Sequence, residues 1–89
     1  MPGVAHLTNH HRETLRKIFT HPSSGNVEWH QVLSLLEAVG TVTDEPNGKV
    51  RVTVGAETET LVRPRHKDVD EELLSRLRRM LTGAGLAPG

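Results

Sequence analysis

Hydrophobic residues recur along this chain at two spacings, and the spacing changes once near the middle. In the first part they recur every three or four residues, the period that places side chains on one face of an α-helix. The first such stretch predicts a helix that begins at Thr8 or Asn9 and ends at His21-Pro22, because proline disfavours helical backbone in the preceding residue. Its apolar face consists of Leu15, Ile18 and Phe19.

A second helical stripe follows between Asn26 and Gly40. We expect Asn26 to cap the start of this helix and Gly40 to close it in the left-handed conformation that glycine adopts easily. Because Trp29 shares its face with aliphatic residues, the pattern favours a core anchor over an exposed stacking platform. The stripe contains Trp29, Val32, Leu33, Leu36 and Val39.

Beyond Gly40 the spacing of the apolar residues falls to two, which is typical of β-strands with one buried face. We expect three antiparallel strands, over residues 41–43, 49–54 and 57–63. Asn47-Gly48 offers positive-φ residues for the first hairpin turn, and Gly55-Ala56 makes the second. Val50, Val52 and Val54 alternate with Lys49, Arg51 and Thr53, and in the last strand Thr58, Thr60 and Val62 share one face while Glu57, Glu59, Leu61 and Arg63 share the other.

A third helical stripe follows Pro64, which ends the last strand. We expect this helix to begin with a capping box over residues 68–71 and to end at Gly83 or Gly85. Its apolar residues are Val69, Leu73, Leu74, Leu77, Met80 and Leu81.

These elements predict an α+β fold, a two-layer sandwich in which the second and last helices cover the apolar face of the sheet. The opposite face is polar and stays open to a partner or to the first helix. A chain of 89 residues has room for one domain, which we place over residues 1–89, with order expected over about 8–84.

Composition excludes several classes of protein. The chain has no cysteine, so it holds no disulfide, thiolate metal site, cysteine nucleophile or iron–sulfur cluster. No apolar run approaches the roughly 18 residues of a membrane-spanning helix, and residues 1–7 do not resemble a signal peptide. We therefore expect a soluble, cytoplasmic protein that does not bind membranes.

The charges balance overall but not locally. Lys plus Arg number 11 and Asp plus Glu number 11, so attraction to a polyanion must come from a local patch. Residues 22–62 hold two Lys or Arg against six Asp or Glu, whereas residues 63–89 hold six against four. The chain is therefore acidic in its middle and basic near its C-terminal end.

Positive charge gathers just before the start of the last predicted helix, in Arg63, Arg65 and Lys67. Cationic side chains, helix-start amides and the helix dipole all favour an anion at such a place, so we expect a phosphate site. Lys49 and Arg51 extend this site if the open sheet face takes part. The alternative is a solvated basic turn whose charges pair with Asp68, Asp70 and Glu71.

His66 lies within the same basic stretch and is the candidate catalytic residue. A histidine there can act as general acid or base in phosphodiester cleavage while the neighbouring cations stabilise negative charge. His6, His10 and His11 are expected to be exposed residues, because zinc needs three or four ligands in a fixed polyhedron. The sequence has no Gly-rich phosphate loop, Gly-x-Ser-x-Gly or His-Glu-x-x-His motif, and it implies no metal and no cofactor.

Residues 62–66 and 77–86 carry the clearest part of a resemblance to the HicA toxins of bacterial toxin–antitoxin modules. Val62-Arg63-Pro64-Arg65-His66 looks like the Val-Pro-and-His turn of that family, and residues 77–86 look like its final Leu-Arg-x-x-Leu-x-x-Ala-Gly-Leu. Residues 29–40 resemble its first helix, so the likeness covers about residues 27–86 and leaves out the first predicted helix. It implies a fold like the double-stranded-RNA-binding domain (dsRBD), with the order α-β-β-β-α, in a protein that cleaves mRNA.

The catalytic histidine of the family has no counterpart here. HicA proteins carry it after a Gly-Ser pair at the start of the second strand, where this chain has Asn47-Gly48-Lys49-Val50. No histidine occurs between His30 and His66. The resemblance therefore implies the fold and a surface that binds RNA or a partner more than it implies the nuclease reaction.

Three functional hypotheses follow. The leading one is a HicA-like domain that binds RNA or a protein partner with degenerate or no nuclease activity. The first alternative is an active, metal-independent mRNA interferase that uses His66. The second is a protein-interaction module of a toxin–antitoxin-like or scaffold assembly, with a cognate antitoxin-like protein as partner, and the balanced net charge slightly favours it over nucleic acid. In each case we expect a monomer or a homodimer.

Overall fold

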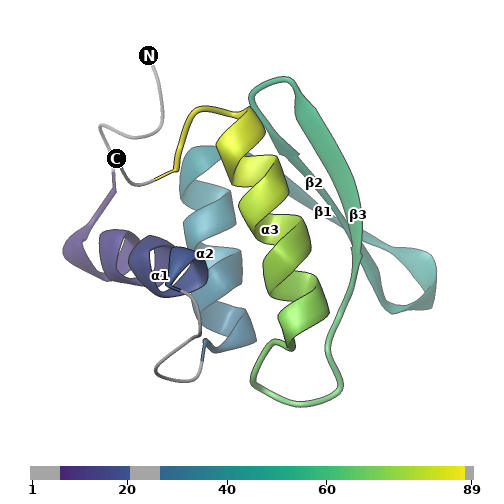
Figure 1. The fold of residues 1–89 in the computed structure, drawn as a ribbon. Coiled ribbons are helices and arrows are strands. Elements are labelled where there is room, and N and C mark those ends of the chain that lie inside the picture. Colours follow the sequence, from purple (N-terminus) through teal and green to yellow (C-terminus); the bar gives the residue numbers. More distant parts are fainter. Residues whose placement is uncertain (1–6, 21–26, 88–89) are drawn as a thin grey trace.

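The computed structural model describes residues 7–20 and 27–87. Within these ranges the chain forms three α-helices and one three-stranded antiparallel sheet (Figure 1), which confirms the expected α+β class. The elements are α1 (Asn9–Phe19), α2 (Trp29–Val39), β1 (Thr41–Glu45), β2 (Lys49–Val54), β3 (Glu57–Val62) and α3 (Glu71–Gly83), with a short 3₁₀ turn at Pro46–Gly48 between β1 and β2.

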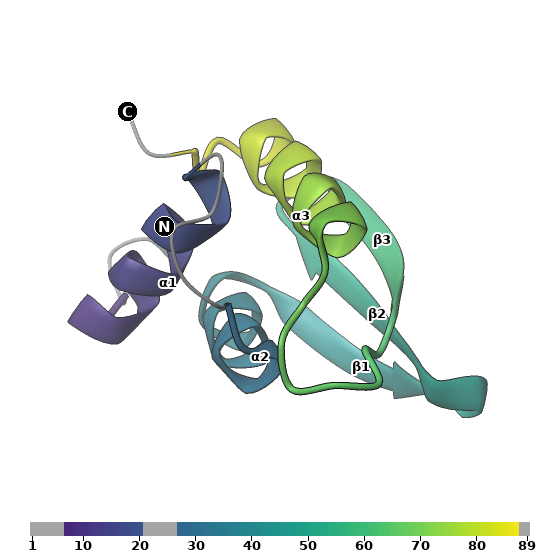
Figure 2. The same ribbon diagram turned by 60° about the horizontal axis from the view of Figure 1, so that its bottom comes forward.

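The elements stack in layers. The sheet has the order β1-β2-β3, and α2 and α3 cover one of its faces, α2 over β1 and β2 and α3 over β3. α1 packs on α2 and α3 on the side away from the sheet (Figure 2), so it does not take the open sheet face. The part from α2 to α3 has the expected α-β-β-β-α order, with α1 as an additional helix.

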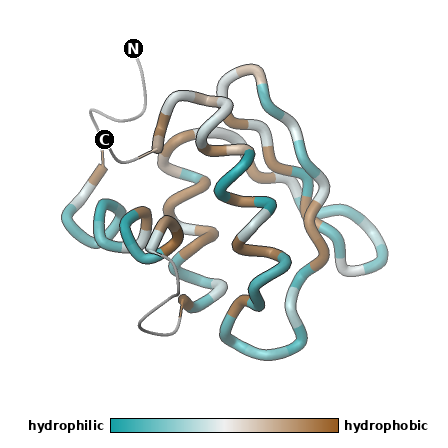
Figure 3. The backbone as a smooth tube through the Cα atoms, viewed as in Figure 1, coloured by the Kyte–Doolittle hydropathy of each residue, from teal (hydrophilic) through white to brown (hydrophobic). Residues whose placement is uncertain are grey.

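The core lies between the sheet and the helices, as the period-2 pattern predicts. Val50, Val52 and Val54 of β2 are buried while Lys49 and Arg51 on the other face are exposed. Figure 3 shows apolar residues, in brown, recurring along the helices and the strands between hydrophilic ones. The helices and β3 add Ile18, Trp29, Val32, Leu35, Leu36, Leu61, Leu73, Leu74, Leu77, Met80 and Leu81.

The burial of Trp29 confirms its predicted role as a core anchor. Leu35 is also fully buried, although the predicted stripe of α2 did not include it, whereas Leu33 is only partly buried. The reason is tertiary: α2 is sandwiched between the sheet and α1, so it buries a wider face than a helix at the surface does.

The start of α1 is confirmed and the start of α2 is not. Thr8 caps α1, its hydroxyl accepting from the His11 amide at 3.2 Å while the Thr8 amide donates to Nδ1 of His11 at 3.3 Å. α2 begins at Trp29 with Glu28 as its N-cap, so the prediction of Asn26 as the cap is wrong. Asn26 lies outside the described residues, and so do His21 and Pro22, the predicted end of the first helix.

Gly40 does not close α2 in the left-handed conformation. Its φ of −164° is extended backbone, so that prediction is wrong. The glycine is needed for close approach instead, because a Cβ at this position would overlap the carbonyl oxygen of Thr53 in β2. The missing side chain lets the chain enter β1 directly against β2.

Both hairpin turns use the residues expected of them. Asn47 and Gly48 have φ values of 71° and 72°, and Gly55 has a φ of 61°. β1 runs two residues further than predicted, since Asp44 and Glu45 continue the ladder opposite β2.

α3 begins later than the predicted capping box. Asp70 is the N-cap, and its carboxylate accepts from the Leu73 amide at 2.9 Å. At the other end Gly83 is the last helical residue and Gly85, with a φ of 80°, supplies the left-handed position. The Leu86 amide then donates to the Leu81 carbonyl at 2.8 Å, as in a Schellman motif.

Candidate functional site

The loop between β3 and α3, residues 63–70, carries most of the predicted site, and its backbone is fastened to the start of α2. The Trp29 amide donates to the Lys67 carbonyl at 2.6 Å, and the Val69 amide donates to the Val27 carbonyl at 2.9 Å. Glu28 and Asp68 pair between these two bonds as an isolated antiparallel bridge. The loop therefore presents its side chains from a defined backbone.

Two of the predicted phosphate-binding arginines are already in ion pairs. Arg63 donates to Oδ1 of Asp44 at 2.9 Å, and Nη2 of Arg51 lies 2.8 Å from Oε2 of Glu45. Both carboxylates belong to β1, so the acidic end of this strand neutralises cations from β2 and from the loop. Exposed pairs of this kind add at most about 1 kcal/mol to stability, yet they lower the local positive charge.

The other predicted cations are exposed and unpaired. Arg65, His66 and Lys67 follow one another in the loop, and none makes an ion pair or a side-chain hydrogen bond with another described residue. Lys49 is exposed and unpaired in the same way, and the register sets it opposite Val62 at the end of β3. Lys49 thus lies at the end of the sheet where the chain leaves β3, whereas Lys67 lies where the loop meets the start of α2.

At the start of α3, one of the amides that the sequence led us to expect in an anion site already has an acceptor within the protein. The Asp70 carboxylate already accepts from the Leu73 amide, and Glu71 and Glu72 lie in the first turn. Negative side chains in this position interact favourably with the helix dipole. These carboxylates compete with a phosphate for the first turn of α3, and neither Arg65 nor Lys67 makes an ion pair with Asp68 or Asp70.

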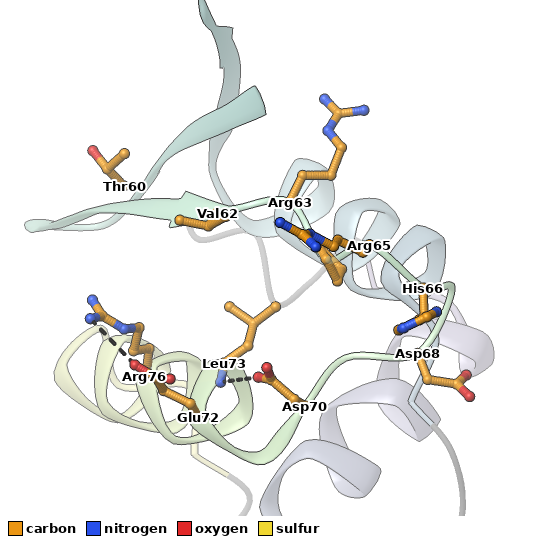
Figure 4. Close-up of a pocket in the computed structure, with 11 residues that line it drawn as sticks. Thr60, Val62, Arg63, Arg65, His66, Asp68, Asp70, Glu72, Leu73 and Arg76 are labelled. Carbon is orange, nitrogen blue, oxygen red and sulfur yellow. Dashed lines mark hydrogen bonds and ion pairs between the residues drawn. The ribbon is translucent and has the colours of Figure 1, made fainter. Parts of the chain in front are cut away.

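A cavity of about 490 Å³ lies between the loop, β3 and the first half of α3. Thr60 and Val62 line it from the strand, and Leu73 and Arg76 face them from the helix (Figure 4). A second hollow of about 260 Å³ continues along α3 and shares Glu72 and Arg76 with the first. Together the cavity and the hollow form a groove between β3 and α3. The sequence pattern did not predict this groove, since strand periodicity does not reveal which strand edge stays uncovered.

His66 lines the cavity but has no hydrogen-bond partner among the described residues. A catalytic histidine usually needs a second group that fixes its ring. The role of His66 as general acid or base stays a prediction.

The other histidines of the described ranges, His10, His11 and His30, serve local structure or face solvent. His11 completes the cap of α1 and lies 2.9 Å from the Ser34 hydroxyl, while Nδ1 of His30 lies 3.2 Å from Glu28. His10 is exposed and His6 lies outside the described residues. In residues 7–20 and 27–87 no three His, Cys, Asp or Glu side chains gather in a way that could hold a metal ion.

Comparisons with protein-family models, curated proteins and solved structures returned no match for this chain. The likeness to HicA toxins accordingly stays a prediction from the residues alone. None of the helices in the described ranges is long and apolar enough to cross a membrane.

Proposed function

We propose that this chain is a small HicA-like RNA-binding domain that holds the phosphate backbone through Arg65, Lys67 and Lys49. One observation carries the proposal: consecutive loop cations are exposed and unpaired on a backbone that is hydrogen-bonded to Val27 and to Trp29 at the start of α2. Unneutralised Lys and Arg side chains bind phosphates by displacing condensed counterions.

The mode of binding that this surface supports is recognition of the backbone rather than of bases. The only aromatic residues of the Phe, Tyr or Trp type are Phe19 and Trp29, and Trp29 is buried. The open sheet face bears threonines and charged residues, so it offers no ring on which a base could stack. Contacts to phosphates fix position without reading sequence, as in dsRBD recognition of duplex RNA.

A binding experiment with a duplex RNA of about 20 base pairs at low salt tests the proposal, a length that exceeds the roughly 16 base pairs that a dsRBD spans. We expect the Arg65→Ala, Lys67→Ala double variant to bind about tenfold more weakly, since each lost phosphate contact removes part of the electrostatic attraction. The matched control is Arg16→Ala on the exposed side of α1, which should bind as the parent does. Absence of binding at low salt, or an equal loss in the control, overturns the proposal.

An RNA-cleavage assay distinguishes binding from catalysis. We expect the purified protein to leave RNA intact, because nothing in the described structure orients His66. If the parent protein cleaves RNA and His66→Ala binds RNA without cleaving it, the interferase alternative replaces the binding proposal.

A second candidate function, binding of a protein partner, is favoured by a separate observation. Val62 is 66% exposed, and it stands out among the large hydrophobic residues of the described structure. It lies at the end of β3, the strand whose second edge is not paired with another strand.

A further inference from the structure

β3 offers a row of backbone hydrogen-bonding groups at its free edge. The Arg63 amide donates to the Gly48 carbonyl, so the backbone N–H of Arg63 is directed toward the β2 side of the strand. In an antiparallel ladder this direction alternates, and the two-residue turn at Gly55-Ala56 gives the same phase. Leu61, Glu59 and Glu57 therefore bond to β2, whereas the N–H and C=O groups of Thr58, Thr60 and Val62 point away from the sheet.

These edge groups open onto space rather than onto another element. Thr58, Thr60 and Val62 are exposed, and Thr60 and Val62 line the 490 Å³ cavity below α3. The 260 Å³ hollow extends this space along the helix past Ser75 and Arg79. A groove between an edge strand and a helix is the setting in which an extended peptide adds to a sheet.

The charges of the groove select the kind of peptide. Arg65 lines one part of it and Arg79 another, and neither makes an ion pair with a described residue. Among the carboxylates of the groove, Glu59 and Glu72 lie 3.7 and 4.0 Å from Arg76, Asp70 caps α3, and Asp68 makes no ion pair with a described residue. Arg65 and Arg79 are thus unpaired cations of the groove, and each favours an acidic side chain of the occupant beside it.

We propose that an extended, acidic segment of a partner protein binds in this groove as a fourth strand along β3. Its backbone pairs with Thr58, Thr60 and Val62, its carboxylates meet Arg65 and Arg79, and its apolar side chains cover Val62. The proposal goes beyond RNA binding and does not depend on it, because the paired groups are backbone atoms of β3.

β3 also carries features that oppose pairing with an arbitrary strand. Glu57 and Glu59 lie on the inward face of this edge strand, a placement that discourages edge-to-edge aggregation. A second folded copy would bring these carboxylates and its own α3 into the groove. A flexible segment of another protein meets the edge without that crowding.

The test uses a synthetic peptide, acetyl-Gly-Thr-Asp-Val-Glu-Val-Asp-Thr-Gly-amide, and a matched peptide with lysine at each acidic position. We expect the acidic peptide to slow amide hydrogen exchange at Thr58, Thr60 and Val62, measured by NMR, and to bind about tenfold more tightly than the lysine peptide. If neither peptide protects these amides at millimolar concentration, or if the lysine peptide binds equally well, the proposal is wrong.

Two substitutions at one position isolate the backbone contribution. Thr60→Pro removes an edge N–H that no strand uses, so the sheet should fold while peptide binding is lost; Thr60→Val keeps the N–H and should keep binding. If both variants bind equally, the peptide is not adding to β3. RNA affinity should be the same in both, which separates this proposal from RNA binding.

The Arg79→Glu variant tests the proposal independently if Thr60→Pro folds poorly. This substitution should weaken binding of the acidic peptide and strengthen binding of the lysine peptide, whereas Arg12→Glu on α1 should change the binding of neither peptide. A dimer of the parent protein that Thr60→Pro disrupts would assign the edge to a second copy and overturn the partner proposal.

Discussion

Gly40 stands where α2 gives way to β1, and its lack of a side chain lets two backbone segments pass at close range. Its neighbours are backbone atoms of Thr53 and Val54, which cannot rotate out of the way. At Gly83, by contrast, an added Cβ meets only the end of the Glu57 side chain. The same substitution should therefore have opposite consequences at the two positions.

We expect Gly40→Ala to lower the free energy of unfolding by about 1–3 kcal/mol, the range of overpacking in a well-packed site. Gly83→Ala, the matched control, should be neutral or stabilising by up to about 1 kcal/mol, because alanine favours helix and Glu57 can shift. Urea unfolding of both variants measures this. Equal stability of the two would show that the contact with β2 does not require glycine.

Residue-level predictions from the sequence failed mainly at helix starts. Asp68 and Asp70 are both cap-type residues two positions apart, and nothing local chooses between them. A tertiary contact decides which of the two caps the helix: Asp68 forms a β-bridge with Glu28, and Asp70 caps α3. By contrast Thr8, Asn47 and Gly48 were predictable, since each acts within its own turn.

At the scale of elements, α1 is held to the rest of the molecule by a side chain from α3. Nε of Arg78 donates to the Ile18 carbonyl at the end of α1 at 2.6 Å, and Nη1 lies 3.0 Å from Glu71. This arginine is mostly buried, with 19% of its side chain exposed. It joins the last turn of α1 to α3, a link that the sequence pattern does not show.

Arg78→Ala should destabilise the protein by about 1–3 kcal/mol, because a part-buried carbonyl loses a charged donor. Amide exchange should accelerate most in α1. Its neighbour Arg79 is exposed and unpaired, so Arg79→Ala should change stability by less than about 0.5 kcal/mol. Similar effects of the two variants would mean that α1 is docked by its apolar face alone.

Two adjacent residues of β3 lie on opposite faces of the sheet and differ strongly in exposure. Leu61 is 1% exposed and Val62 is 66% exposed. Leu61→Ala should cost about 2–5 kcal/mol through a core cavity, and Val62→Ala should cost less than about 0.5 kcal/mol. Thermal unfolding compares them, and a larger loss in Val62→Ala would place the strand in the opposite register.

At the scale of the molecule, the layer order followed from periodicity alone. The apolar stripes on α2 and α3 and the alternate valines on β2 are all buried when the two helices cover one face of the sheet. The position of α1 and the uncovered edge of β3 did not follow, because both depend on contacts between segments distant in sequence. For the candidate site, the sequence located the basic loop but not the carboxylates of β1 that pair with Arg63 and Arg51.

The central claim is that the unpaired cations Lys49, Arg65 and Lys67 bind phosphates, and the salt dependence of RNA affinity tests it most directly. We predict that the logarithm of the association constant falls linearly with the logarithm of salt concentration, and that replacing Lys49, Arg65 and Lys67 by alanine lowers the slope by about one for each cation. A slope that is the same in the parent and the triple variant would contradict the account.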